Sequence, residues 1–364
     1  MGKSLFLVNS VYHLLSTVHI KRDVFPWEEA DLVVTDATPG LSGLAPRLRE
    51  TGLFQRVILA ETKELSSRFP MNEEKAVAQC FGERETTLQW VLGEELEREY
   101  SQVFFPNCDW LARLLACRYY SSPCPFYWVE DGFSSYVVDF FNPHRAAVNR
   151  HAEGEKLKEK TQAALLYEPR LAMRGDSIPN RYIPKLSRKD GELKELLNFI
   201  FDYRPPRELP PFLFLEQSFR TENIQGNDLE LMARCQQVVG PGNFGVKPHP
   251  RNGDNLPQSM GLTRKIDLSA PWELFLLNQE REIPTVITVC SNGALSGRIC
   301  LGLDTSTVML YKLYTGKVLW KENEILARYL ETFRRQFAGK QYYVPQTVYE
   351  LESILKYLGG QHGN

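Results

Sequence analysis

The sequence predicts an α/β fold made of two Rossmann-like domains. Short apolar runs alternate with helical patterns through the first 140 residues, a segment rich in proline and charge follows at about 174–211, and a second alternating set begins at 212. Continuous apolar strands separated by helices are typical of parallel sheets covered on both faces. Ligands of such sheets bind beyond the carboxyl ends of the strands, so we expect functional residues there.

The N-terminal stretch "MGKSLFLVNSVYHLL" predicts a first strand that runs into a helix. Its apolar run is broken by Asn9, Ser10, Tyr12 and His13. The stretch is therefore too short and too polar for a membrane span, and no small-residue cleavage site of a signal peptide follows it. The remaining elements of the first half come in order along the chain. The predicted strands are 4–10, 30–36, 56–61, 102–107 and 126–131, and the helical patterns include 42–52 and 85–100.

The second half repeats this alternation after the proline-rich segment, which holds one short amphipathic helix at 191–202. Apolar segments of the second half lie at 212–217, 243–250, 271–278, 285–292 and 306–314, with helices near 227–239 and 347–358. The predicted division is an N-terminal domain at 1–175, a linker at 176–211 and a C-terminal domain at 212–364. Two Rossmann-like halves joined by a linker describe the GT-B architecture, in which the domains face a central cleft. No GxGxxG follows the first strand, so a dinucleotide site is disfavoured.

The composition excludes several classes of protein. The chain has 364 residues, 43% of them hydrophobic and 24% charged, which is the ordinary balance of a globular protein. A net charge of −2 argues against nucleic acid as a general partner. The seven cysteines contain no CxxC pair, so we expect neither a disulfide framework nor a zinc site. This pattern favours a reducing, cytoplasmic compartment.

The first motif with chemical potential is Glu130-Asp131-Gly132, at the end of a predicted strand. Adjacent residues of an extended chain point to opposite sides, so one carboxylate can face a cleft while the other caps the next element. An acidic turn with a helix cap explains the motif equally well.

The second motif is "KPHPR", in which Pro248 and Pro250 flank His249, with Lys247 and Arg251 close by. Each proline restricts its own φ and favours an extended conformation for the residue before it. A ring held this rigidly suits contact with an anion in a fixed pose. The alternative is a loop with an incidental histidine.

The third motif is Ser291-Asn292-Gly293, where an apolar strand passes into a predicted helix. A hydroxyl, an amide and free backbone N–H groups at a helix start are suited to a phosphate. Taken alone, the tripeptide is also an ordinary turn.

The order of the three motifs resembles that of the bacterial sialyltransferases, which carry a D/E-D/E-G motif, an HP motif and a Ser/Ser-Thr motif. His249 and Ser291 lie 42 residues apart in this chain. Residues 212–315 resemble glycosyltransferase family 52, which contains lipooligosaccharide sialyltransferases and has related polysialyltransferase-like capsule enzymes. The N-terminal half matches mainly in its opening strand and in the Glu-Asp-Gly segment. Asn292 departs from the pattern because a second hydroxyl is usual there.

The resemblance implies an inverting transfer of sialic acid, or a related nonulosonic acid, from a CMP-sugar to a glycan hydroxyl. It places the donor on the C-terminal domain and the acceptor on the N-terminal domain. A carboxylate base is needed, together with donors to the departing phosphate. His249, as imidazolium, fits the second role, helped by Ser291 and the N–H groups around Asn292 and Gly293. Lys247 and Arg251 add positive charge, and Pro250 completes the HP motif.

The base is Asp131 by preference, because it sits at the turn, with Glu130 as its neighbour. Glu216 and Glu222 are alternatives, since family-52 enzymes draw the base from a carboxylate upstream of the HP motif. No Asp-x-Asp is placed for a magnesium-nucleotide clamp, so we expect activity without a metal and no cofactor other than the donor substrate. The implied acceptor is a glycan of lipooligosaccharide or capsule, which implies peripheral association with the inner membrane.

Two rival readings use the same residues. A CDP-polyol phosphotransferase of the teichoic-acid type shares the Lys-x-His-Pro and serine motifs. The second alternative is a catalytically silent module that binds a nucleotide or a glycan. Release of CMP from the donor distinguishes a sialyltransferase from both.

Overall fold

The structure of the chain, a computed structural model, describes residues 2–249, 251–252, 255–263, 266, 270–280, 283–318, 321, 323–337 and 341–361. The chain divides into two compact units. Unit 1 comprises Met1–Pro184 and Glu195–Asp202, and unit 2 comprises Lys185–Lys194 and Tyr203–Asn364.

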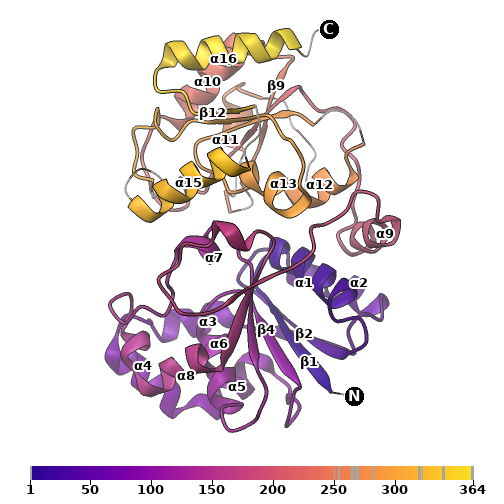
Figure 1. Ribbon diagram of the computed structural model, residues 1–364, viewed down its shortest axis with the longest axis vertical. Coiled ribbons are helices and arrows are strands. Elements are labelled where there is room, and N and C mark those ends of the chain that lie inside the picture. The colour runs from indigo at the N-terminus through magenta and orange to yellow at the C-terminus, as the bar shows by residue number, and fades with distance from the viewer. Residues whose placement is uncertain are drawn as a thin grey trace. The chain divides into compact units, whose positions relative to one another are not determined.

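Unit 1 is built on a seven-stranded sheet whose neighbouring strands are all parallel, in the order β3-β2-β1-β4-β5-β6-β7. Helices lie on both sides of this sheet (Figure 1), which explains why its strands are apolar on both faces. The strands are β1 Lys3–Val8, β2 Glu29–Thr35, β3 Arg56–Ala60, β4 Gln102–Phe105, β5 Phe126–Val129, β6 Thr161–Leu166 and β7 Asn180–Tyr182.

Most helices of unit 1 connect consecutive strands. Ser10 caps the first of them by accepting a hydrogen bond from the backbone of His13. The helices are α1 Val11–Asp23, α2 Ala45–Glu50, α3 Thr62–Arg68, α4 Glu74–Gly82, α5 Arg84–Leu92, α6 Trp110–Arg118, α7 Ser134–Val137 and α8 Ala152–Lys160, with 3-10 turns at Ser42–Leu44, Ala147–Arg150 and Pro169–Leu171. The residues of α9 Gly191–Ile200 are divided between the two units.

Two predicted helices of unit 1 were too long. The helix expected at 85–100 ends at Leu92, because Gly93 takes a left-handed conformation (φ +64°) and closes the helix. The segment expected at 42–52 forms a 3-10 turn followed by the six-residue helix α2. The predicted strands of this half lie within two residues of β1 to β5 at each end.

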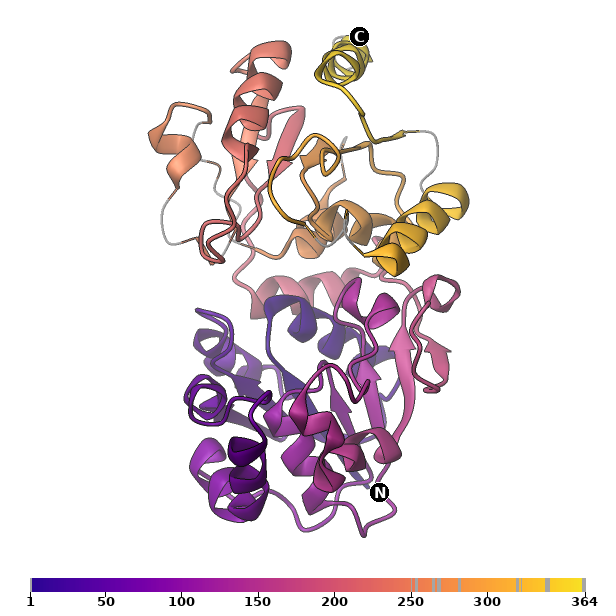
Figure 2. The same cartoon turned by 90° about the vertical axis from the view of Figure 1, so that its left-hand side faces the viewer.

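Unit 2 has a second, five-stranded parallel sheet in the order β12-β11-β10-β8-β9. Helices cover both faces of this sheet too, with α10 packed against α16 and α12 against α13, and the view turned by 90° also shows this covering (Figure 2). The elements are β8 Phe212–Leu215, α10 Asp228–Val239, β9 Phe244–Lys247, α11 Leu256–Ser259, α12 Trp272–Asn278, β10 Thr285–Thr288, α13 Gly293–Leu301, β11 Thr307–Met309, α15 Glu324–Gln336, β12 Tyr342–Tyr343 and α16 Val348–Gln361.

The order of strands reverses once in each sheet, and this identifies where a ligand is expected. In unit 1 the reversal lies between β1 and β4, and in unit 2 between β8 and β10. At such a switch point, the loops after two adjacent strands run in opposite directions and leave a crevice at the carboxyl edge. The segment expected at 306–314 contributes only β11 to the sheet, and its remainder forms a loop at this edge. Among the described residues, no helix is long and apolar enough to cross a membrane.

Candidate functional site

Polar side chains gather at the switch point of unit 1. Asn9, which follows β1, donates from Nδ2 to Asn107 Oδ1 and to Asp109 Oδ2, both at 2.7 Å. Its Oδ1 accepts a hydrogen bond from Thr35 Oγ1, at the end of β2, at 3.0 Å. Asn9 therefore ties together the carboxyl ends of three neighbouring strands. Burial raises the pKa of Asp109, which also caps helix α6 through the backbone N–H of Ala112.

Asp131 lies at the same edge, after β5, and its side chain is 33% exposed. The turn behind it needs Gly132 in a left-handed conformation (φ +61°). Its Oδ1 lies 2.5 Å from Nε2 of the buried His13, on the first turn of α1. Nδ1 of this histidine accepts the backbone N–H of Asn9 at 3.3 Å, so Nε2–H is the donor of the ring and points at Asp131. The histidine orients the carboxylate and leaves part of it open to solvent.

Glu130, although adjacent, is in a different environment. It is 1% exposed, and its carboxylate accepts hydrogen bonds from Tyr12 Oη (2.8 Å), Tyr136 Oη and the backbone N–H of Tyr167 (2.9 Å). Burial raises the pKa of Glu130 to about 7, and these hydrogen bonds oppose the shift. Because its acceptor sites face protein donors, this carboxylate suits an anchoring role in the turn better than proton transfer to a substrate.

In unit 2, the loop after β9 is fixed by a carboxylate after β8. The backbone N–H of His249 donates to Glu216 Oε2 at 2.9 Å, and Arg220 Nη1 donates to Glu216 Oε1 at 2.7 Å. The buried Glu216 therefore holds the histidine loop in place. Nδ1 of His249 accepts the backbone N–H of Arg251 at 3.2 Å, which leaves Nε2 as the nitrogen that can donate. Pro250 lies outside the described residues.

His249 is a neutral imidazole at pH 7 in the ligand-free chain. Burial, followed by the positive charges of Arg251 and Lys247, lowers its pKa to about 4. Burial also lowers the pKa of Lys247, and the neighbouring carboxylate of Glu273 opposes that shift. The expected imidazolium therefore requires an anion beside the ring, because only a negative charge there favours the protonated form.

This geometry predicts that CMP raises the pKa of His249. The free chain should show a value of about 4, and saturation with CMP should raise it by about 1–3 units, because the phosphate stabilises the imidazolium. Affinity for CMP should then fall as the pH rises through the higher value. Nitrogen-15 NMR of the imidazole over pH 3–8, assigned with His249→Ala, measures both values. A pKa near 6.5 in the free chain, or one unchanged by CMP, contradicts the prediction.

The turn after β10 contains the predicted phosphate residues. The backbone N–H of Ser291 donates to Thr288 Oγ1 at 3.2 Å, and Ser291 Oγ accepts the N–H of Gly293 at 3.3 Å. Ser291 Oγ–H can still donate to a ligand. Asn292 is the N-cap residue of α13. Its buried Oδ1 and the buried Nε1 of the nearby Trp272 both lack a hydrogen-bond partner within the described part of the chain. Unmatched buried polar atoms beside a helix start indicate a place where a ligand completes the hydrogen bonding.

Gln217 connects the two loops of unit 2 across its switch point. Its Nε2 donates to Thr288 Oγ1 at 2.8 Å and its Oε1 accepts the N–H of Cys290 at 3.4 Å. Its carbonyl accepts from Asn252 Nδ2 at 3.0 Å, just beyond the histidine loop. The structure therefore places the histidine and serine motifs on either side of the loop after β8.

The remaining candidate carboxylate, Glu222, is close to the histidine loop. It forms an ion pair with Arg251 Nη1 at 3.2 Å and accepts a hydrogen bond from Ser218 Oγ at 2.5 Å. Both partners of the ion pair are more than 40% exposed, so the pair is weak. Glu222 remains accessible, whereas Glu216 is enclosed.

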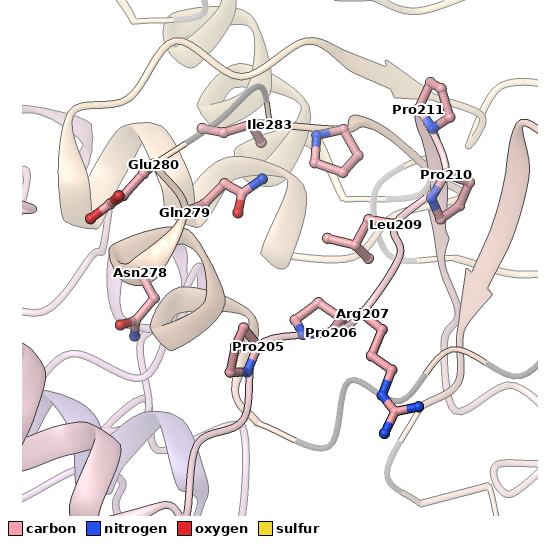
Figure 3. Close-up of a pocket in the computed structure, with 11 residues that line it drawn as sticks. Pro205, Pro206, Arg207, Leu209, Pro210, Pro211, Asn278, Gln279, Glu280 and Ile283 are labelled. Atoms are coloured by element: carbon pink, nitrogen blue, oxygen red, sulfur yellow. The ribbon is translucent and has the colours of Figure 1, made fainter.

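A separate cavity of about 460 Å³ lies at the other edge of the unit 2 sheet. Figure 3 shows it between the proline-rich segment before β8 and the chain that precedes β10. Pro211 and Pro284 directly precede these two strands, so the cavity adjoins their amino ends, away from the motif residues. Among the described residues, no three His, Cys, Asp or Glu side chains are grouped to hold a metal ion.

Sequence reasoning missed three residues of these sites: His13, Asn9 and Gln217. The available signal was position, because Asn9 follows the first apolar strand directly and Gln217 follows the first strand of the second half. Partners as distant as His13 and Asp131, 118 residues apart, have no local signature.

Comparison with known proteins identifies the fold. No protein-family model and no curated protein matches the chain. Among solved structures, UGT89C1 of Arabidopsis thaliana complexed with UDP-L-rhamnose is similar with a TM-score of 0.56, at 11% identity over 98% of this chain and 90% of that one. The glycotransferase of kitacinnamycin gives 0.53, at 12% identity over 100% and 91%. An α/β-galactoside α-2,3-sialyltransferase from Photobacterium phosphoreum gives 0.52, at 7% identity over 96% and 99%.

These similarities extend over nearly the whole chain and confirm the predicted fold class. The protein is α/β with two Rossmann-like units on parallel sheets, the GT-B type of glycosyltransferases.

Proposed function

We propose that this protein is an inverting, metal-independent glycosyltransferase that moves sialic acid, or a related nonulosonic acid, from a CMP-sugar to a hydroxyl of a cell-surface glycan. The observation that carries the proposal is the exposure and the fixed orientation of the Asp131 carboxylate. It is the one carboxylate of the Glu-Asp-Gly motif that is open to solvent, and the buried His13 orients it at 2.5 Å. The GT-B fold, shared with a sialyltransferase among other glycosyltransferases, supports the same conclusion.

In this mechanism Asp131 accepts the proton of the acceptor hydroxyl as its oxygen bonds to the anomeric carbon of the donor. The bond from that carbon to the phosphate oxygen breaks, and its electron pair stays on CMP. His249 supplies a hydrogen bond or a proton from Nε2 to the leaving phosphate, which offsets the developing charge. Ser291 Oγ–H and the N–H groups at the start of α13 hold the same phosphate.

The alternative bases fit less well. Glu130 is buried and engaged by three donors, and Glu216 uses both oxygens to hold Arg220 and the histidine loop. Glu222 is accessible, but it lies in unit 2 and its carboxylate is already paired with Arg251 at 3.2 Å. Asp131 remains the carboxylate with both access and fixed orientation.

The lysine, arginine and proline of the histidine motif have secondary roles in this proposal. Lys247 is a half-buried cation beside the histidine, and Arg251 is an exposed one already paired with Glu222. Both add positive potential that attracts the donor. Pro250, whose ring limits its own φ, is proposed to complete the motif. The acceptor is proposed to be a glycan of lipooligosaccharide or capsule, reached by an enzyme at the inner face of the membrane.

Release of CMP from CMP-N-acetylneuraminic acid tests the proposal directly. We expect the purified chain to release CMP, and His249→Ala to lower the rate about 10²–10³-fold, since one donor to the developing charge is lost. His144→Ala is the matched control, because His144 is exposed in unit 1, outside the proposed site, and its variant should retain the rate. Stabilisation by CMP or CDP without CMP release would instead favour the polyol phosphotransferase or the silent module. No response to any cytidine nucleotide would refute the sialyltransferase, the polyol phosphotransferase and a nucleotide-binding module, and would favour a module that binds a glycan alone.

A further inference from the structure

A second cavity in unit 2, of about 340 Å³, lies between the loop after β11, helix α15 and strand β12. Six of its lining side chains carry the argument that follows: Tyr311, Lys312, Lys321, Glu331, Arg334 and Tyr342. We refer to it as the β11–α15 pocket. Its size falls in the range of small-molecule sites, about 300–1,000 Å³.

The β11–α15 pocket adjoins the same sheet edge as the serine turn. Strands β10 and β11 are parallel neighbours with Thr288 opposite Met309, and the N–H of Leu310 continues the ladder to the carbonyl of Thr288 at 2.8 Å. Adjacent strands lie about 4.8 Å apart. The loop after β11, which contains Lys312, and the serine turn after β10 therefore begin at the same edge of the sheet.

The pocket carries more positive than negative charge. Its lining contains three cations, Lys312, Lys321 and Arg334, and one carboxylate, Glu331. That carboxylate is bonded at 2.7 Å to Arg335, which is not among the lining residues, and reaches Arg334 only at 3.8 Å. Lys321 Nζ donates to the carbonyl of Tyr314 at 2.6 Å, which fixes the ammonium without cancelling its charge. The pocket is thus suited to an anion.

The hydroxyl of Tyr342 provides an independent observation. It is buried and has no hydrogen-bond partner among the residues that the structure describes. Burial, with Tyr311 nearby, raises its pKa well above the usual range, while Arg334 opposes the shift, so the phenol stays a neutral donor close to the guanidinium. An unmatched hydroxyl beside cations indicates that a ligand oxygen completes the site.

The geometry points to a binding site for the carboxylate of an acidic sugar. Arg334 can hold a carboxylate through its planar fork, the Tyr342 hydroxyl can donate to it, and the tyrosine rings offer faces for a sugar ring. The inference rests on the proposed function, because a nonulosonic acid is itself a carboxylated sugar. The carboxylate has two sources: the sugar of the donor, or an acidic residue of the acceptor glycan.

Calorimetric titration with 3′-sialyllactose, and with lactose as the neutral probe, tests the site. We expect the wild-type chain to bind sialyllactose and not lactose. Lys312→Ala combined with Arg334→Ala should weaken sialyllactose about 10- to 100-fold, as expected for lost charge-assisted hydrogen bonds. Lys317→Ala combined with Arg328→Ala, two exposed cations outside the lining, should have no effect. Equal binding of lactose, or unchanged affinity in the pocket variant, overturns the inference.

Tyr342→Phe separates binding from folding. Since the hydroxyl has no partner in the ligand-free chain, its removal should leave the melting temperature unchanged or raise it, while sialyllactose binding weakens. A lower melting temperature with unchanged binding means a structural role and overturns the assignment of Tyr342.

Cytidine nucleotides then show whether the bound carboxylate belongs to the donor or to the acceptor. They also distinguish a failure of the pocket inference from a failure of the proposed function. If an unreactive 3-fluoro analogue of the CMP-sugar excludes sialyllactose, the pocket takes the carboxylate of the donor. If both bind together, it takes that of the acceptor. CMP binding by the pocket variant, together with lost sialyllactose binding, refutes neither proposal and supports the pocket. Sialyllactose binding by a chain that ignores all cytidine nucleotides refutes the proposed function alone.

Discussion

Asp131→Asn is expected to lower transfer of the sugar by about 10²–10⁴-fold, the usual contribution of a positioned general base. Asparagine keeps the shape of the side chain, and its Oδ1 can still accept a hydrogen bond from His13 Nε2–H, so the turn should fold normally. What is lost is the ability to take a proton from the acceptor hydroxyl. Initial rates with a saturating donor, alongside the dissociation constant for CMP, measure this: the rate should drop while CMP binding stays the same.

Variants of the other carboxylates supply the controls for this result. Glu222→Gln should retain most of the activity, because it removes only a weak exposed ion pair with Arg251. If Asp131→Asn remained active while Glu222→Gln did not, the base would lie in unit 2, as the family-52 pattern allows. If both variants bound CMP more weakly, the loss would reflect folding and not proton transfer.

Asp31→Ala is expected to have the largest effect on stability, a loss of about 3–5 kcal/mol. Asp31 is 0% exposed, forms ion pairs with Lys3 Nζ (2.8 Å) and Arg56 Nη2 (2.6 Å), and accepts a hydrogen bond from Tyr100 Oη (2.8 Å). Removing the carboxylate leaves two cations together at the start of β1 and β3, and a buried hydroxyl without its acceptor. For a unit of this size, the melting temperature should fall by roughly 6–20 °C.

The pH dependence provides a check on this explanation. Burial raises the pKa of Asp31, but hydrogen bonds from Arg56, Lys3 and Tyr100 outweigh it, and the net pKa is lowered. A lowered pKa means that the carboxylate stabilises the fold above its unfolded-state pKa, and that this contribution is lost as the pH falls through the folded-state value. The difference between wild type and variant should therefore shrink at acidic pH. A difference that stays constant down to pH 2 would contradict an ionic cause.

Glu97→Ala is the matched comparison. Glu97 contacts the same cations, Lys3 at 3.0 Å and Arg56 at 3.4 Å, but is 44% exposed. Its loss should cost less than about 1 kcal/mol. Since Asp31 lies near the amino end of β2, opposite the candidate site, the Asp31 variant should keep its activity at low temperature, unlike the Asp131 variant.

Local patterns predicted much of the fold. Apolar runs between helical stretches predicted nearly all strands of both sheets, because a strand covered on both faces must be apolar throughout. They did not predict β6, β7 or β12 as strands: "TQAALL" contains small residues, β7 has only three residues, all exposed, and β12 has only two. The apolar segment at 271–278 forms the helix α12. Gly93 ended a helix that its neighbours would have continued.

The sequence by itself determined the fold class and the loops on which chemistry is expected, because strand ends, prolines and glycines act on their immediate neighbours. Only the tertiary structure decided how the adjacent acids Glu130 and Asp131 differ. Three donors surround the first, two of them from distant segments, whereas the second is held by His13 and remains open. The pKa of about 4 for His249 is likewise a product of burial and neighbouring charge. Access, burial and proton affinity depend on groups brought together by folding, and no local stretch of the chain contains them.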